Sequence, residues 1–470
     1  MHFKLSKKIF FVLLLLPIIW SLCTKNPAGT SIESNYETIS SLEFLYDLTY
    51  QKQQKSVKEQ SILSAELDII EKAEGFIVLD LFLYNDAYNK EQYHYPNTTQ
   101  MITDALIAKK KQNPNIDIIF ITDPINGFYG SYTEKNMNLM SKNDIIVIET
   151  NLDALKDSNP LYSGYYRLFI KPFGNTGKGF IKNPLDKTAP NINIRSVLKL
   201  ANFKANHRKL IITEKEALIA SANPHDASSY HSNVAVRFQS DVIQYMLEGE
   251  RTVAKQSGIT LPELQYKNTN TNHIDNTKVK YITERGIFNS LINNIKRAKQ
   301  GDTIYMGIFY ITDFDLIKEL ENAANRGVSI YIVADPNKDA FGIQKDGSPN
   351  RSVLTKLNKK SENIHIRWYD THGEQYHTKM SYFDFENQNV IIIGSGNYTR
   401  KNIKGYNLEA DLEIVTEKEN NFSKEINAYF QKIWNNEYGD YTVAFETYQQ
   451  NSIIKKVLYY IQETTGLCTY

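Results

Sequence analysis

Two stretches in the second half of the chain decide its fold: HTKMSYFD at residues 377–384 and VIIIGSGN at residues 390–397. A polar turn separates them, and each has the length and apolar content of a β-strand, so together they predict a β-hairpin. Side chains alternate between the two faces of a strand, which places His377 and Lys379 on the same face. The returning strand can bring the serine and the asparagine of its GSGN end beside them.

The first half of the chain contains the same pattern, HRKLIITE at residues 207–214 followed by ALIASAN at residues 217–223. In both copies an acidic residue follows the histidine by seven positions. His-x-Lys alone is a weak signal, since it also occurs at His2, but two copies with the same spacing and the same following strand are specific. The candidate site residues are therefore His207, Lys209, Glu214, Ser221 and Asn223 in the first copy, and His377, Lys379, Asp384, Ser395 and Asn397 in the second.

The repeat extends to the elements that precede each hairpin. Apolar periodicity predicts helices at 63–73, 101–111, 288–298 and 314–325, and buried strands at 76–83, 116–123, 303–310 and 328–335. In each half the second strand ends in Asp-Pro, at Asp123 and Asp335, which fixes the register between the halves. Alternating strands and helices indicate an α/β fold with two lobes, each built on parallel strands.

The composition agrees with this organisation. A chain of 470 residues with 41% hydrophobic residues can bury two cores, which excludes a disordered or a collagen-like class. Lys and Arg number 54 against 53 Asp and Glu, so the chain as a whole lacks the basic footprint of non-specific DNA binding. Cys23 and Cys468 are its only cysteines, too few for a disulfide framework or a Cys-rich zinc site.

The first half carries an insertion. Pro124 and His207 are 83 residues apart, whereas Pro336 and His377 are 41 apart, so the first half has about 42 extra residues. Much of the insertion is aromatic and rich in glycine, as in FGNTGKGF at residues 173–180. Such loops can wall a substrate cleft or meet a membrane interface, and they can equally pack as ordinary loops.

The N-terminus has the order of an export signal, because Lys4, Lys7 and Lys8 precede an apolar run at residues 9–23. The run is shorter than the roughly 20 residues that comfortably span a bilayer, which favours a removed signal peptide over a retained anchor. We therefore expect an exported protein (secreted, periplasmic or extracytoplasmic) in which residues 1–28 are a signal peptide or a membrane anchor.

A polar stretch, YKNTNTNHIDNT, looks like the linker between the two lobes. It places the first lobe at residues 29–270 and the second at residues 271–470.

The duplicated motif resembles that of the phospholipase D superfamily, a repeated HxKxxxxD followed by GSxN. The resemblance covers residues 60–435, and the second copy matches in full, whereas the first has Glu214 for Asp and Ala220 for Gly. Glu409 resembles the later acidic position of the family, while Ala235 stands where the first half would carry it, which leaves open which carboxylate orients His207. The resemblance implies two pseudo-symmetric α/β sandwich lobes that share one active site at their interface.

The chemistry of these residues suits phosphodiester cleavage, which needs a nucleophile, a proton donor for the leaving alcohol and cations for the non-bridging oxygens. Two histidines, two lysines and two asparagines supply all of these, so no metal and no other cofactor is expected. By resemblance, His207 is the nucleophile that forms a phosphohistidine and His377 is the general acid and base. Five further residues flank the motifs and are more often structural than catalytic: His225, His231, His365, His372 and Glu374.

The superfamily contains phospholipid hydrolases and transferases as well as nucleases, so the motif defines the bond that is broken rather than the molecule. Export, aromatic insertions and a net charge near zero favour a phospholipid substrate at a membrane surface. We therefore predict a monomeric phospholipase D-like phosphodiesterase, a hydrolase or phosphatidyltransferase. The alternative is an exported nuclease of the same superfamily that acts on DNA or RNA.

Overall fold

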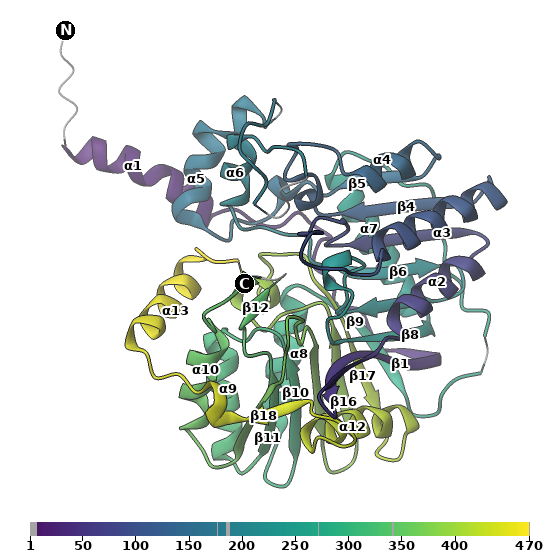
Figure 1. Cartoon of the computed structure of the whole chain (residues 1–470), viewed down its shortest axis with the longest axis vertical. Coiled ribbons are helices and arrows are strands. Elements are labelled where there is room, and N and C mark those ends of the chain that lie inside the picture. Colours follow the sequence, from purple (N-terminus) through teal and green to yellow (C-terminus); the bar gives the residue numbers. More distant parts are fainter. Residues whose placement is uncertain (1–6, 176, 185–188, 271, 341–342, 470) are drawn as a thin grey trace.

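The structure is a computed structural model of the chain and describes residues 7–175, 177–184, 189–270, 272–340 and 343–469. Its strands and helices alternate, which confirms the α/β class, and two lobes of like construction lie one above the other in Figure 1.

The first lobe supplies the first half of a large mixed sheet. Its strands are β1 (Glu37–Lys52), β2 (Lys55–Glu59), β3 (Phe76–Leu81), β4 (Asp117–Thr122), β5 (Ile146–Glu149), β6 (Lys209–Thr213), β7 (Ala217–Ala220) and β8 (Asn233–Ser240). The helices of this half of the chain are α1 (Lys7–Leu22), α2 (Ile62–Lys72), α3 (Thr98–Gln112), α4 (Lys135–Ser141), α5 (Pro160–Phe169), α6 (Ile194–Leu200) and α7 (Val242–Gln256).

The second lobe repeats the plan. Its strands are β9 (Lys278–Thr283), β10 (Thr303–Ile308), β11 (Ser329–Ala334), β14 (Ile364–Tyr369), β15 (Lys379–Asp384), β16 (Asn389–Gly394), β17 (Ala410–Thr416) and β18 (Thr442–Ala444), with a small separate pair, β12 (Asp339–Ala340) and β13 (Ile343–Gln344). Its helices are α8 (Arg285–Arg297), α9 (Phe314–Asn325), α10 (Asn350–Asn358), α11 (Arg400–Ile403), α12 (Asn421–Trp434) and α13 (Ile453–Thr465).

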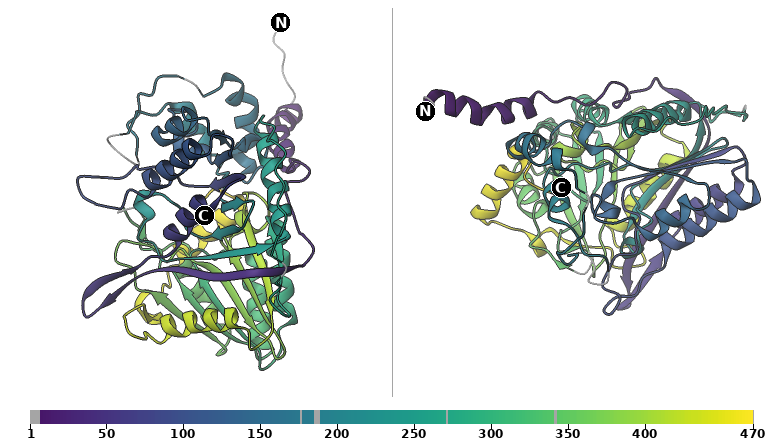
Figure 2. Two further views of the ribbon diagram at one scale, coloured as in Figure 1. Left: turned by 90° about the vertical axis from the view of Figure 1, so that its right-hand side faces the viewer. Right: turned by 90° about the horizontal axis from the view of Figure 1, so that it is seen from above.

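The strand order shows the duplication directly. The first lobe runs β5-β4-β3-β6-β7-β8-β1, and the second runs β18-β14-β11-β10-β15-β16-β17-β9. In both lobes the His-Lys strand, β6 or β15, lies antiparallel to a strand of the parallel layer, β3 or β10. The lobes join where β1 pairs with both β8 and β9, and Figure 2 shows this long strand along the boundary between them. The two His-Lys strands therefore occupy equivalent places on either side of that boundary.

The cores follow from the two-residue period of the strands. In β3, Ile77 and Leu79 face an outer core with α2 and α3, whereas Val78 faces a central core that contains residues of α7 and α12. In β10, Ile304 and Met306 likewise face an outer core with α8 and α9. Burying each such side chain stabilises the fold by about 1.5–3 kcal/mol. Because the central core takes side chains from both lobes, it holds them in one fixed relation.

Most predicted elements occur where the periodicity places them, and α9 has the predicted bounds of residues 314–325. The sequence analysis did not find β1, whose polar and apolar residues do not alternate strictly and whose pairing with β8 and β9 is visible only in the folded chain. The extra residues of the first half lie after β5 and form α5 and α6.

The N-terminal segment forms α1. Lys4, which belongs to the predicted export signal, lies outside the described residues. Within the part of the chain that the structure describes, none of the helices is both long and apolar enough to cross a membrane.

Candidate active site

The two motif histidines meet at the boundary between the lobes. The ring centroids of His207 and His377 are 6.5 Å apart, a separation that admits one phosphate group between them. The backbone N–H of His207 donates to the carbonyl of Leu408 in the second lobe, and that of His377 donates to the carbonyl of Ser232 in the first, both at 2.8 Å. Each histidine is thus held in place by the opposite lobe, and the site is a composite of the two.

The repeated Asp-Pro positions fix the chain just before each histidine. Asp123, after β4, accepts the backbone N–H of Asn206 at 2.7 Å, and Asp335, after β11, accepts that of Tyr376 at 2.7 Å. Burial raises the pKa of both carboxyl groups to about 7. The feature that aligns the two halves in sequence therefore also positions the histidines.

Each imidazole is oriented by a side chain from the opposite lobe. Nδ1 of His207 lies 2.8 Å from a carboxylate oxygen of Glu409, and Nδ1 of His377 lies 3.2 Å from the amide oxygen of Asn233. The ionised Glu409 carboxylate and the Asn233 amide oxygen both accept, so with Glu409 ionised Nδ1 of each ring carries the proton and Nε2 is left for the substrate. The predicted supporting residue Glu409 thus lies beside His207.

Asn233 is the functional residue that the sequence analysis missed. The sequence motif aligned Ala235 with Glu409. In the sheet, however, Ala235 pairs with Ala220, and Gly394, the equivalent of Ala220 in the second lobe, pairs with Asp411 rather than with Glu409. The Ser221 hydroxyl bonds Asn233, which lies 12 residues later in the chain, whereas the Ser395 hydroxyl bonds Glu409, which lies 14 residues later. The segment between the two bonded residues is therefore two residues shorter in the first lobe. Asn233 is therefore the structural equivalent of Glu409, and this offset was the available signal.

The two serines also differ from their predicted role as substrate-binding groups. The Ser395 hydroxyl donates to Glu409, and the Ser221 hydroxyl donates to the amide oxygen of Asn233 at 3.1 Å. Both serines are fully buried. They hold the residues that orient the histidines, so both hydroxyls are bonded within the protein.

The lysines lie beside the histidines in both copies. The Nζ of Lys209 donates to the carbonyl of His207 at 2.7 Å, and that of Lys379 donates to the carbonyl of His377 at 2.6 Å. A phenylalanine ring lies beside each pair. The centroid of Phe82 is 5.0 Å from the Nζ of Lys209 and 4.7 Å from the ring centroid of His207. The centroid of Phe309 lies at the same two distances from Lys379 and His377.

The electrostatics of the cluster favour an anion. Burial, together with the charges of Lys209 and Lys379, lowers the pKa of both histidines well below the usual value. Burial also lowers the pKa of Lys209 to about 7. Burial and the charge of Lys209 lower the pKa of Lys379 well below its usual value. Burial raises the pKa of Glu409 to about 7. A bound phosphodiester offsets the repulsion between the two ammonium groups, so the site is complementary to a negative charge.

The asparagines of the motif, Asn223 and Asn397, lie just after β7 and β16. The amide oxygen of Asn223 accepts the backbone N–H of Leu83 at 3.3 Å. The amide oxygen of Asn397 is buried without a hydrogen-bond partner among the described residues. Asn397 therefore has hydrogen-bonding capacity that nothing in the described chain satisfies.

The acidic residues of the motif do not join this cluster. Glu214, in the turn after β6, accepts the backbone N–H groups of Glu74 at 2.8 Å and Phe76 at 3.1 Å, and Asp384, at the end of β15, pairs with Lys418. A strand advances about 3.3 Å per residue, so five residues carry each carboxylate roughly 16 Å beyond the lysine of its motif. Their assignment as catalytic residues is corrected: both hold the far ends of the hairpins.

A buried ion-pair network lies behind His207. Arg208 is fully buried, and its guanidinium donates to Glu250 and to Glu284 of the second lobe, both at 2.9 Å. The same Glu284 oxygen accepts the backbone N–H of Glu409 at 3.1 Å. Glu284 adopts φ +45° and ψ −114°, a conformation that costs free energy and persists only when its surroundings enforce it. The network ties the residue after His207 to the residue that orients His207.

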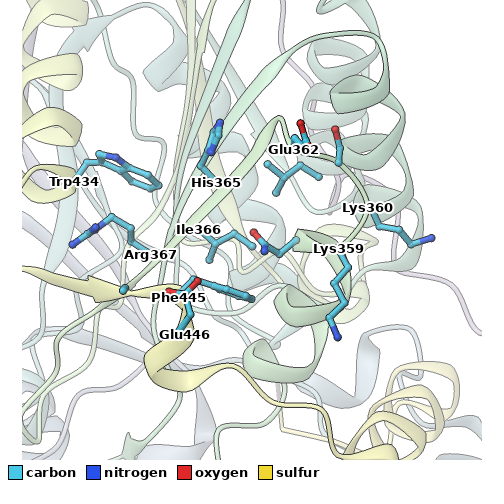
Figure 3. A pocket seen from close by; sticks show the side chains of 13 residues that line it. Lys359, Lys360, Glu362, His365, Ile366, Arg367, Trp434, Phe445 and Glu446 are labelled. Carbon is cyan, nitrogen blue, oxygen red and sulfur yellow. The ribbon is translucent and has the colours of Figure 1, made fainter.

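The flanking histidines divide into two groups. His231 lies near the site, with its ring 6.1 Å from that of His377, and it lines a hollow of about 930 Å³ together with Glu374 and His372. His225 contacts the hydroxyl of Ser228 at 2.9 Å. His365 is remote, because it stacks on Tyr331 and points into a separate hollow beside Arg367 and Trp434 (Figure 3).

The described residues contain no group of three or more His, Cys, Asp or Glu side chains that could hold a metal ion. The positive charge beside the histidines comes instead from the two lysines.

Part of the chain matches a known family, and the fold of the chain is similar to that of a solved structure. The family model described as "Cardiolipin synthase, PLD-like domain" matches residues 291–434, which contain the second hairpin and Glu409. No curated protein matches the chain in sequence. Among solved structures, phosphatidylserine synthase from Haemophilus influenzae Rd KW20 has a similar fold, with a TM-score of 0.59 and 9% identity over 92% of this chain and 96% of that chain. NucT from Helicobacter pylori aligns with 34% of this chain and 96% of its own, with a TM-score of 0.28 and 18% identity.

The family match confirms the resemblance to the phospholipase D superfamily over residues 291–434. The fold of the whole chain, with its two lobes, is similar to that of the phosphatidylserine synthase.

Proposed function

We propose that the protein is a phospholipase D-type phosphodiesterase that cleaves or transphosphatidylates phospholipids through a covalent phosphohistidine. The observation that carries the proposal is the pair His207 and His377, whose rings are 6.5 Å apart with one lysine beside each. Two imidazoles at this separation can act on opposite sides of one phosphorus atom.

The reaction has two balanced steps. In the first, Nε2 of His207 attacks phosphorus, the bond to the head-group oxygen breaks, and that oxygen takes a proton from Nε2 of His377. His377 enters this step as an imidazolium with both ring nitrogens protonated, because the bound phosphodiester anion raises its pKa. In the second, His377 takes a proton from water or an alcohol, whose oxygen attacks phosphorus and releases His207. Lys209 and Lys379 stabilise the charge on the non-bridging oxygens in both steps.

The assignment of His207 as the nucleophile rests on the difference between the orienting residues. Attack through Nε2 places positive charge on the imidazole, and the Glu409 carboxylate at 2.8 Å stabilises that charge. His377 faces the neutral amide of Asn233, which stabilises its imidazolium less and makes it the stronger acid. The nucleophile and the acid thus have different partners that suit their roles.

A phospholipid substrate is favoured by the predicted export, by the aromatic insertion and by the family match to a cardiolipin synthase domain. One observation favours the nuclease alternative. The hollow beside His231 combines Tyr93, Tyr95 and Tyr230 with Lys58, a composition that also suits the stacked bases and the backbone of a single-stranded nucleic acid. We also propose that the protein is exported and acts as a monomer, with α1 as its signal segment or membrane anchor.

One experiment separates the substrates. Purified protein is incubated with labelled phosphatidylcholine, phosphatidylglycerol and single-stranded DNA, and the products of each are scored. The variant His207→Ala should abolish turnover, whereas Glu214→Gln, which alters a carboxylate outside the site, is the matched control and should keep it. Cleavage of DNA with no release of lipid head groups would establish the nuclease instead.

A second measurement tests the roles of the histidines. With a p-nitrophenyl phosphodiester, whose leaving group needs little protonation, His377→Ala should still phosphorylate His207, and the adduct should accumulate. His207→Ala should give no adduct. An acid-labile phosphate found on His207→Ala but not on His377→Ala would reverse the roles.

A further inference from the structure

The exposed apolar side chains of this protein are concentrated on one part of its surface. Among the described residues, nineteen of the twenty-three exposed large hydrophobic side chains belong to α1, to the insertion from α5 to α6, or to α13 and the residue Leu467. Phe173 and Phe180 are each 71% exposed, and Ile454 is 81% exposed. Single exposed apolar residues are normal, but a concentration of this kind marks a surface that contacts something apolar.

Helix α13 presents an apolar stripe away from the protein. Ile454, Val457, Leu458 and Ile461 are exposed and follow the spacing of one helix face. The opposite face is anchored through buried groups, since the carboxylate of Glu463 accepts the backbone N–H of Arg400 at 3.0 Å. The stripe therefore contributes nothing to the core of the second lobe.

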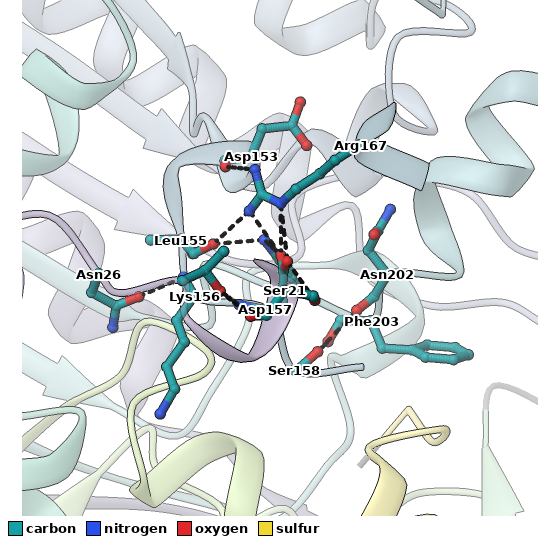
Figure 4. Close-up of polar contacts among 12 residues, drawn as sticks. Ser21, Asn26, Asp153, Leu155, Lys156, Asp157, Ser158, Arg167, Asn202 and Phe203 are labelled. Carbon is teal, nitrogen blue, oxygen red and sulfur yellow. Dashed lines mark hydrogen bonds and ion pairs between the residues drawn. The ribbon is translucent and has the colours of Figure 1, made fainter. Parts of the chain in front are cut away.

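Helix α1 is fixed to the insertion by specific contacts. Gly164 of α5 has no side chain, and a Cβ there would collide with the backbone of Pro17, so the two helices approach closely. The hydroxyl of Ser21 donates to buried Asp157 at 2.7 Å, and Figure 4 shows Arg167 converging on the same carboxylate, at 2.8 Å. These contacts hold α1 and α5 as one unit with their outer apolar residues exposed.

These elements are continuous with one another and with the catalytic site. Figures 1 and 2 show α1, α5 and α13 on the same side of the molecule. Gly466, just after α13, packs against the backbone of Ser158 without room for a Cβ. Two residues later, Cys468 is buried against Phe309, whose ring contacts His377. The buried residues that follow α13 thus link this helix to the ring beside His377.

The same segments carry a strong positive charge. Residues 1–36, 150–206 and 452–470 together contain 15 Lys or Arg and 5 Asp or Glu, a net charge of +10 in a chain whose total is +1. The rest of the chain is therefore at −9. In the loop after α5 the basic and aromatic residues interleave, and all five are exposed: Lys171, Phe173, Lys178, Phe180 and Lys182.

We propose that the loop at residues 171–175 and 177–182 and helix α13 form a docking face, which α1 extends when it is retained, and that this face binds an anionic phospholipid bilayer and presents the active site to its surface. Apolar side chains insert at the level of the head groups, and the lysines pair with anionic lipids. The proposal rests on the proposed function only in one respect: a phospholipid substrate explains why the protein would dock on a bilayer. The binding itself is a separate property of the surface.

The test measures binding without catalysis. Full-length protein is mixed with vesicles of phosphatidylcholine, or of phosphatidylcholine and phosphatidylglycerol in equal parts, and the bound fraction is measured by flotation at low and high salt. Binding to the anionic vesicles should be the stronger and should weaken with salt. The variant K171Q/K178Q/K182Q should bind these vesicles about 100-fold less tightly at low salt, at about 1 kcal/mol for each lysine.

The apolar part of the face is tested by F173S/F180S and by I454S/V457S, each of which should lower affinity at least tenfold at either salt concentration. The controls Met101→Ser and Tyr438→Ser remove exposed apolar residues outside the face and should bind as the wild type does. All variants should keep wild-type rates on a soluble short-chain substrate.

Equal binding by face and control variants would overturn the docking proposal, as would a wild type that ignores vesicles or that instead dimerises through this face in sedimentation velocity. If the protein binds vesicles but releases no head group, the proposed function fails and the docking face stands.

Discussion

Replacing Glu409 with Gln tests the proposed nucleophile most directly. The substitution keeps the size of the side chain and an acceptor for Nδ1 of His207, so it removes the charge and little else. Glu409 and His207 are both buried, and an imidazolium and a carboxylate about 4 Å apart attract each other by about 4 kcal/mol at an effective dielectric constant of 20. That energy is available only once the imidazole becomes positive during the attack on phosphorus.

The expected result is therefore a fall of about 10² to 10³ in the rate of phosphohistidine formation, since each 1.4 kcal/mol is worth a factor of ten. KM should change little, because the neutral imidazole of the ground state gains less from the charge. A p-nitrophenyl leaving group should not rescue the variant, since the loss concerns the attacking group and not the departing one.

The assay is a single-turnover quench with a p-nitrophenyl phosphodiester, followed by mass spectrometry of the phosphorylated protein. The matched control is Asp384→Asn, which removes the same charge from the end of β15 and should react at close to the wild-type rate. A Glu409→Gln enzyme that phosphorylates His207 within tenfold of the wild type would refute the electrostatic role of this carboxylate.

Three further predictions follow from buried charges. Glu284→Gln should lower the free energy of unfolding in urea by about 3–5 kcal/mol, because Arg208 keeps one carboxylate of two, and His207→Ala, which does not touch that pair, is the comparison. Burial raises the pKa of Glu66 to about 8, so the folded state loses stability as pH rises from about 4.5 to 8, by about 1.4 kcal/mol per pH unit at most. Glu66→Gln should remove this dependence of the unfolding free energy on pH in denaturation curves. An unchanged dependence in the variant would contradict the prediction. Activity should persist in excess EDTA, because Lys209 and Lys379 supply the positive charge; loss on chelation that a divalent cation restores would mean that the lysines have another role.

The duplication could be predicted from the sequence because its signals are local. Apolar runs such as residues 390–393 must be buried wherever they lie, and the spacing from His377 to Asp384 is written in one strand. The meeting of His207 and His377 then follows from the repeat itself. Equivalent strands of two lobes that share a core come to equivalent places at their boundary.

The orienting residues could not be assigned in this way, because they depend on register between strands. Whether Asn233 or Ala235 lies opposite Ser221 is decided by a connection that is two residues shorter than its counterpart in the second lobe. The motif also does not predict where its acidic side chains lie. Glu214 and Asp384 are part of the sequence motif, but they lie at the strand ends away from the lysines, where Glu214 accepts a backbone N–H and Asp384 pairs with Lys418.

An amide rather than a carboxylate at position 233 suits the proposed chemistry once both halves are considered together. When both lysines are protonated and Glu409 is ionised, the described charged groups that contact the two histidine residues carry one excess positive charge, which a phosphodiester monoanion cancels. A second carboxylate in place of Asn233 would remove that excess and would raise the basicity of His377 to match His207. Two equal imidazoles suit neither step, because the first needs a nucleophile whose positive charge is stabilised and a partner that gives up its proton readily. In the proposed reaction, the asymmetry between Glu409 and Asn233 thus suits two histidines with different roles.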